Sequence, residues 1–96
     1  MKVVYSPRAL ADLEVIATFY SDTASPTIAE SIERRFHEVI ERISHAPESA
    51  PRVSQRSQVR VVSVVRYPFR IFYRARAETI DILHIRHTSR RPANFG

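Results

Sequence analysis

The chain has 96 residues, 44% of them hydrophobic, with a formal net charge of +5 and no cysteine. This length accommodates one domain with one modest core, and the missing cysteines exclude disulfides, thiol catalysis and the common cysteine-based zinc sites. No stretch is long and apolar enough for a signal peptide or a membrane span, so the expected compartment is the cytoplasm and no membrane contact is predicted.

The first half of the chain predicts one strand and two helices. A short apolar run at residues 3–5 precedes Ser6-Pro7, which combines an N-cap side chain with a proline suited to the first helical turn. Ser25-Pro26 repeats this start signal, and Ala46-Pro47 ends the second helix. The two apolar stripes at helical spacing are Leu10, Leu13, Ile16, Ala17 and Tyr20, then Ile32, Phe36, Val39, Ile40 and Ile43.

The second half predicts strands. Residues 47–57 have a loop-like composition, and three runs rich in valine, isoleucine and aromatic residues follow at 59–65, 69–74 and 80–87. The sequence therefore predicts an α+β domain of order β-α-α-β-β-β, in which two helices pack on one face of a small, mainly antiparallel sheet. The other face would meet solvent or a partner. The domain would span residues 1–96, with a flexible tail from about residue 88.

Charge is divided between the two halves of the chain. Residues 1–50 carry five basic and eight acidic side chains, whereas residues 51–96 carry ten arginines against Glu78 and Asp81. Fourteen of the fifteen basic residues are arginine, whose planar fork suits carboxylates and phosphates. The cationic half therefore indicates an acidic partner, unless the genome simply favours arginine codons.

The arginines of the predicted strands are the main candidates for binding. They are Arg60, Arg66, Arg70, Arg74 and Arg86. Strand alternation places Arg70 and Arg74 on one face, and likewise Arg60 and Arg66 on one face. Together these arginines could form one cationic surface. A solvated face whose charges block edge pairing is the alternative.

Three other groups could carry chemistry. His84 and His87 are three apart on a strand and would point to opposite faces, so only one, His87, is a candidate acid or base for ribose chemistry. The set His37, Glu38, Glu41 and His45 matches no recognised ligand spacing, so no metal or cofactor is predicted. Four aromatic residues are interleaved with arginine: Tyr67, Phe69, Phe72 and Tyr73. They could stack on nucleic-acid bases, but we expect them to lie in the core.

Four motifs occur in one order along about nine tenths of the chain. They are S-P-x-A-x-x-D-L-x-x-I-x-x-[FY] within 6–20, I-x-x-I-x-x-x-P at 40–47, V-R-x-x-x-V-x-x-Y-P-F-R-I-F-Y-R at 59–74, and I-D-I-L-H-I-R-H-x-x-R-x-P at 80–92. Together they resemble ParE-type toxins of the RelE/ParE superfamily. The resemblance implies the toxin of a bacterial type II toxin–antitoxin system with a RelE/ParE-like fold.

The superfamily resemblance implies one of two activities. ParE-type members poison DNA gyrase, whereas RelE-type members cut mRNA on the ribosome with basic residues and a terminal tyrosine or histidine. At the positions of the nuclease residues this chain has Val65, Thr88 and Asn94. This favours the gyrase inhibitor. An alignment slip of one residue would leave an mRNA endoribonuclease as the alternative, with Arg66, Arg86 and His87 as its catalytic residues.

The resemblance also implies a partner, a ParD-like antitoxin that forms a hetero-oligomer with the toxin and itself binds operator DNA, so no sequence-specific DNA binding is expected of this chain. An acidic, amphipathic antitoxin segment would fold on the toxin. The expected antitoxin contacts are Arg60, Arg70, Arg74 and Arg86, with Leu13, Ala17 and Tyr20 as apolar contacts. The expected residues for toxicity and target binding lie in the tail: His87, Arg90, Arg91 and Phe95.

Overall fold

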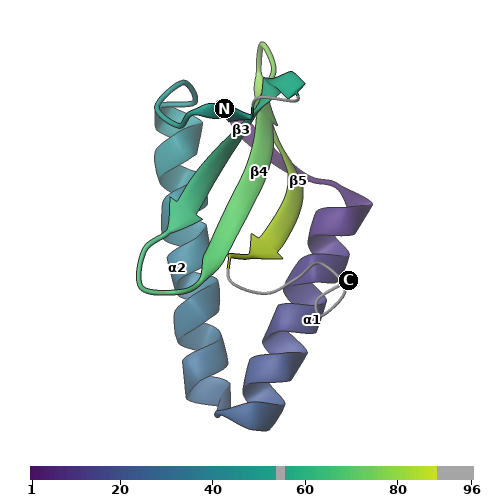
Figure 1. Ribbon diagram of the computed structural model, residues 1–96, viewed down its shortest axis with the longest axis vertical. Helices are drawn as coiled ribbons and strands as arrows, with labels where there is room; N and C mark the ends of the chain where they lie inside the picture. Colours follow the sequence, from purple (N-terminus) through teal and green to yellow (C-terminus); the bar gives the residue numbers. More distant parts are fainter. Residues whose placement is uncertain (54–55, 89–96) are drawn as a thin grey trace.

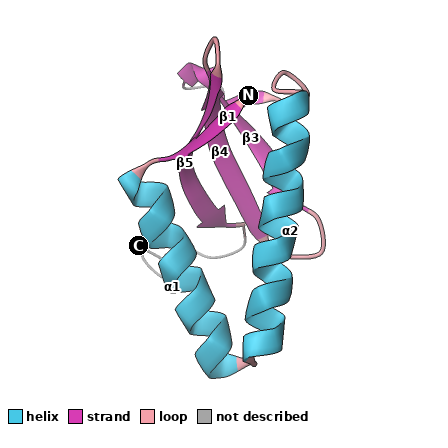
Figure 2. Ribbon diagram, turned by 180° about the vertical axis from the view of Figure 1, so that it is seen from behind, coloured by secondary structure: helices cyan, strands magenta, loops and turns pink. Residues whose placement is uncertain are grey.

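A helical hairpin covers one face of a five-stranded sheet in the computed structural model, which describes residues 1–53 and 56–88 (Figures 1 and 2). The elements are β1 (Lys2–Tyr5), α1 (Pro7–Thr23), α2 (Pro26–His45), β2 (Arg52–Val53), β3 (Arg56–Val64), β4 (Phe69–Ala75) and β5 (Thr79–His87). The predicted α+β class and the order of helices and strands are confirmed.

Both helices begin at the predicted signals. The Ser6 hydroxyl accepts the N–H of Ala9 (3.0 Å), and the Ser25 hydroxyl accepts that of Ile28 (3.1 Å). The Ser6 hydroxyl also donates to the carbonyl of Leu83 (2.8 Å), which ties the start of α1 to β5. Of the helices in the described residues, none is long and apolar enough to cross a membrane.

The strands lie in the order β1-β5-β4-β3-β2. β1 runs parallel to β5, and the other neighbours are antiparallel. The prediction of a loop throughout residues 47–57 is wrong, because β2 lies within it and β3 already begins at Arg56. The cause is backbone pairing rather than composition: the Pro51 carbonyl accepts the N–H of Val61 (3.0 Å) and starts a short ladder.

The core lies between the helices and the covered face of the sheet. Its most deeply buried members come from α2, β4 and β5: Ile32, Val39, Ile43, Phe69, Ile71, Tyr73, Ile80 and Ile82. Phe69 is at the centre of an edge-to-face aromatic cluster, with ring centroids 5.4 Å from Phe36, 6.1 Å from Tyr20 and 5.3 Å from His87. Full burial of one large apolar side chain of this core stabilises the fold by about 2 kcal/mol.

The apolar stripe predicted for α1 is partly wrong. Ile16 is buried as expected, but Leu10 is 55% exposed. The buried side of α1 instead includes Ala9 and the carboxylate of Asp12. Asp12 has hydrogen-bond partners on β5, so the helix turns this polar residue toward the sheet and leaves Leu10 outside.

Replacing Tyr73 by phenylalanine should lower the free energy of unfolding by about 1 kcal/mol at neutral pH. The Tyr73 hydroxyl donates to the Pro47 carbonyl (2.7 Å). Burial raises the pKa of Tyr73, and the positive charge of Arg60, which lowers this pKa, offsets only part of the effect. The unfolded chain therefore loses this proton first, and stability should fall as pH rises above 10.

Urea unfolding at neutral and alkaline pH measures both effects. The variant should show a shallower alkaline loss of stability than the wild type, with a residual dependence from Tyr5, whose pKa is also raised by burial. Tyr67→Phe is the matched control. An unchanged stability and pH profile in Tyr73→Phe would contradict this prediction.

Candidate binding surface on the open face of the sheet

The face of the sheet that turns away from the helices, here the open face, is seen in Figure 1, whereas Figure 2 has the helices in front. Residues paired across neighbouring strands share a face, so the register identifies its members. Those of β3, β4 and β5 include Val61, Ser63, Arg70, Phe72, Arg74, Asp81, His84 and Arg86.

A bulge in β5 brings two of these side chains to the open face. Tyr73 pairs with Ile82, but the preceding Phe72 pairs with His84, so that Leu83 is an extra residue in β5. Under strict alternation His84 would have pointed to the core with Ile82. The extra residue turns it to the open face, together with the residue two positions on, Arg86.

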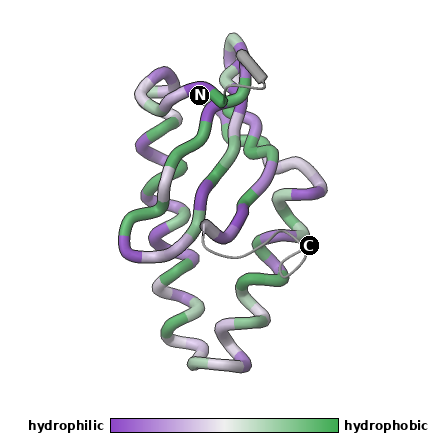
Figure 3. Tube along the Cα trace, viewed as in Figure 1, coloured by the Kyte–Doolittle hydropathy of each residue, from purple (hydrophilic) through white to green (hydrophobic). Residues whose placement is uncertain are grey.

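Arg70 and Arg86 are directly opposite each other on β4 and β5. Both side chains are exposed, and neither forms an ion pair within residues 1–53 and 56–88. Figure 3 shows hydrophilic stretches side by side in these two strands. Like charges opposite one another destabilise a sheet, so this pair, here the arginine pair, is suited to receive an anionic group.

The arginine pair adjoins an apolar area. The rings of Phe72 and His84 are stacked, with centroids 5.8 Å apart and planes at 22°. A shallow pocket of about 410 Å³ lies over them, lined by Arg8, Val53, Val59, Phe72, Leu83, His84 and Arg86. An apolar floor with a cationic margin suits an apolar side chain flanked by carboxylates.

Asp12 holds His84 in place. One oxygen of this carboxylate, Oδ2, lies 2.7 Å from Nδ1 of His84 and accepts the N–H of Ile85 at 2.9 Å. The other oxygen lies 3.5 Å from Nε of Arg8. Asp12 is only 7% exposed. It binds α1 to the part of β5 that follows the residues paired with β1. The sequence interpretation missed this role, although an aspartate beside the apolar positions of a helix was a usable signal.

Positive charge at the far end of the open face is partly neutralised. Asp81 Oδ2 lies 3.3 Å from Nη2 of Arg74 and 2.7 Å from Nε of Arg76. The predicted common face of Arg70 and Arg74 is confirmed by the register, since Phe72 separates them on β4. Arg74 nevertheless contributes less free charge than the arginine pair.

The prediction that Arg60 joins this surface is wrong in its geometry. Arg60 pairs with Tyr73 on the covered side of the sheet, and its Nη1 donates to the carbonyls of Glu48 (3.3 Å) and Ala50 (2.7 Å). It therefore supports the α2–β2 loop. Arg66, predicted to share a face with Arg60, lies instead in the β3–β4 turn at φ 80°.

The two histidines point to opposite faces, as predicted. His84 is on the open face, and His87 is buried on the covered side beside Phe69. Arg86 faces away from His87, and Arg66 lies in a turn, so the three candidate nuclease residues do not converge on one site. The aromatic residues divide likewise: Phe69 and Tyr73 are core residues, Tyr67 packs against the core, and Phe72 lies on the open face.

The three apolar residues predicted on α1 do not form one surface. Leu13 and Ala17 line a groove between α1 and α2. Tyr20 instead packs edge to face with Phe69 and Phe19, so its ring belongs mainly to the core.

The remaining predicted positions include Arg90, Arg91, Asn94 and Phe95, which lie outside the described residues. Of the two other positions used in the nuclease comparison, Val65 is 53% exposed in the β3–β4 turn and Thr88 is exposed at the end of β5. Among the described residues, no group of three or more histidine, aspartate or glutamate side chains could hold a metal ion.

A family model for the ParE toxin of the type II toxin–antitoxin system parDE matches residues 3–92. The chain belongs to the ParE toxin family. The resemblance inferred from the four motifs is thereby confirmed, and membership makes the chain a toxin of a type II toxin–antitoxin system. Among curated proteins, no sequence matches the chain.

Solved structures agree with membership in the ParE family. A chain from the chromosomal ParDE toxin–antitoxin system of P. aeruginosa matches with a TM-score of 0.80 and 27% identity, over 93% of this chain and 97% of that one. The isolated RelE toxin of E. coli matches with a TM-score of 0.59 and 12% identity, over 97% and 89%. The second likeness shows a shared fold alone.

Proposed function

We propose that this ParE-family toxin acts in the cytoplasm by inhibiting DNA gyrase and is neutralised by a ParD-like antitoxin. The proposal is supported by the family match over residues 3–92 and by the similarity to a chain of a ParDE system. A toxin of this class requires a surface that its antitoxin can cover, and the open face is our candidate for that surface.

The observation that carries the antitoxin proposal is the unneutralised arginine pair beside an apolar pocket. An acidic, amphipathic antitoxin segment would place carboxylates on Arg70 and Arg86 and an apolar side chain over Phe72. Arg74 would contribute at the margin. Arg60, turned to the covered side, is removed from the proposed contact surface.

Gyrase inhibition is preferred to mRNA cleavage because the candidate nuclease residues are dispersed. His87 is 8% exposed and packs beside Phe69, whereas Arg86 points to the other side of the same strand. A general base and a phosphate-binding group must lie within reach of one substrate. The residues proposed for target binding are Arg90, Arg91 and Phe95 of the tail. His87, which the sequence analysis expected to act with them, is buried and is not proposed again.

Expression of the toxin without its antitoxin tests the target. Growth arrest with a DNA damage response and intact mRNA is expected, and the purified toxin should inhibit supercoiling by gyrase. Arg90→Ala/Arg91→Ala should keep the fold, measured by circular dichroism, and lose the arrest. Arrest with cleaved mRNA and normal supercoiling would contradict gyrase inhibition and favour the endoribonuclease.

A further inference from the structure

We propose that the pocket beside the arginine pair binds a mononucleotide, that is, a phosphate group carried on a flat, largely apolar base. The inference goes beyond the proposed function, since it assigns a small-molecule site to the toxin when its antitoxin is absent. The pocket of about 410 Å³ has the size of a ligand cavity, and side chains of α1, β2, β3, β4 and β5 line it.

A buried carboxylate holds two polar side chains of this pocket in place. Asp12 Oδ2 lies 2.7 Å from Nδ1 of His84, and the other oxygen lies 3.5 Å from Nε of Arg8. The side chain of Arg8 is 55% exposed, whereas that of Asp12 is 7% exposed and does not itself line the pocket. Arg86 is exposed and supplies the second guanidinium. Since none of the described residues that line the pocket is acidic, its margin is suited to an anion.

The contact with Asp12 also determines what His84 offers to a ligand. A carboxylate only accepts hydrogen bonds, so Nδ1 of His84 carries the proton and Nε2 of the neutral ring is an acceptor. Within the described part of the chain Nε2 has no hydrogen-bond partner, and it is accessible to solvent. A phosphate with one proton can donate to Nε2 and accept from the guanidiniums, whereas an ionised carboxylate can only accept. The donor and acceptor set therefore favours a phosphate over a carboxylate.

The apolar floor indicates the rest of the ligand. Val53, Val59 and Leu83 line it, next to the ring of Phe72 that stacks on His84. Inorganic phosphate would leave this floor in contact with water, whereas a flat base would cover it. A mononucleotide combines both parts in one molecule of suitable size.

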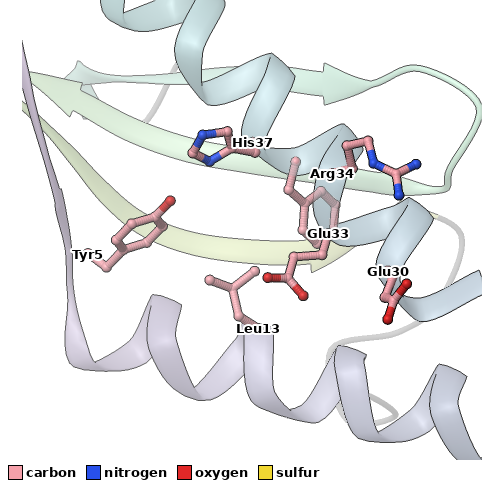
Figure 4. Close-up of a pocket in the computed structure, with 7 residues that line it drawn as sticks. Tyr5, Leu13, Glu30, Glu33, Arg34 and His37 are labelled. Atoms are coloured by element: carbon pink, nitrogen blue, oxygen red, sulfur yellow. The ribbon is translucent and has the colours of Figure 1, made fainter. Parts of the chain in front are cut away.

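The hollow between α1 and α2 does not suit such a ligand. It has a volume of about 440 Å³, and Glu30 and Glu33, both exposed, line it. Figure 4 shows Glu33 beside Leu13 with its carboxylate at the gap between the helices, while Arg34 extends its guanidinium away from that carboxylate. An anion placed there would be repelled by two carboxylates. Arg34 therefore offers a control for the arginines of the proposed site.

Calorimetric titration of the full-length toxin, purified with its antitoxin and then separated from it, tests the pocket. The probes are adenosine monophosphate, adenosine and inorganic phosphate. Adenosine monophosphate should bind about tenfold more tightly than either of the others, because it alone meets both the cationic margin and the apolar floor. Absence of binding, or equal affinities for adenosine monophosphate and inorganic phosphate, would overturn the inference.

Two double variants locate the site. Arg8→Gln/Arg86→Gln should weaken the binding of adenosine monophosphate about tenfold or more, and circular dichroism should show a retained fold because both side chains are exposed. Arg34→Gln/Arg42→Gln removes the same charge from exposed positions of α2, and it should leave affinity within about twofold. In the wild type, the nitrogen NMR signal of His84 Nε2 should shift when the nucleotide is added. Equal losses in both variants, or an unchanged His84 signal, would overturn the inference.

Discussion

Replacing Asp12 by alanine is expected to lower the free energy of unfolding by about 3 kcal/mol. The carboxylate is 7% exposed and is the hydrogen-bond acceptor for the N–H of Ile85 and for Nδ1 of His84. Its removal leaves a buried backbone donor without a partner and removes one of the links between α1 and β5. Because His84 then loses its anchor, the stacked ring over Phe72 should also become disordered.

Urea unfolding of the Asp12→Ala variant measures the loss. Asp12→Asn keeps one acceptor oxygen and should lose about half as much. Asp22→Ala removes an exposed carboxylate from the same helix and should change stability by less than about 0.5 kcal/mol. Equal stabilities for Asp12→Ala and Asp22→Ala would show that the Asp12 contacts contribute nothing.

Reversing the arginine pair, as Arg70→Glu/Arg86→Glu, is expected to weaken antitoxin binding about a hundredfold, or about 2.7 kcal/mol. The two side chains are opposite each other on β4 and β5 and have no carboxylate partner among the described residues, so their charge is free to meet the partner. The fold should be retained, since both side chains are exposed. Binding should also depend less on salt than in the wild type.

Lys2→Glu/Arg52→Glu is the matched control for this reversal. It makes the same change in net charge at the two edge strands, β1 and β2, where both side chains are exposed. Its antitoxin affinity should stay within about threefold of the wild type, since long-range charge alone is screened at physiological salt. Equal losses in both variants would assign the effect to net charge and reject the open face as the antitoxin surface.

The order of elements was predictable because its signals are local. Ser6-Pro7 and Ser25-Pro26 place both helix starts, and the stripe from Ile32 to Ile43 gives the buried face of α2. The short strand β2 was not predictable, since it forms only where the chain after α2 meets β3. The exposure of Leu10 was also missed, because hydrophobic spacing cannot distinguish a stripe that meets the core from one that meets a groove.

The sequence by itself determined the α+β class, both helix starts and, through its four motifs, membership in the ParE toxin family. Only the tertiary structure decided which side chains form the candidate site. The inserted Leu83 turns His84 and Arg86 to the open face, and cross-strand register turns Arg60 away from it. The physical reason is that a strand's alternation holds only within one unbroken register, and a bulge is set by partners distant in the chain.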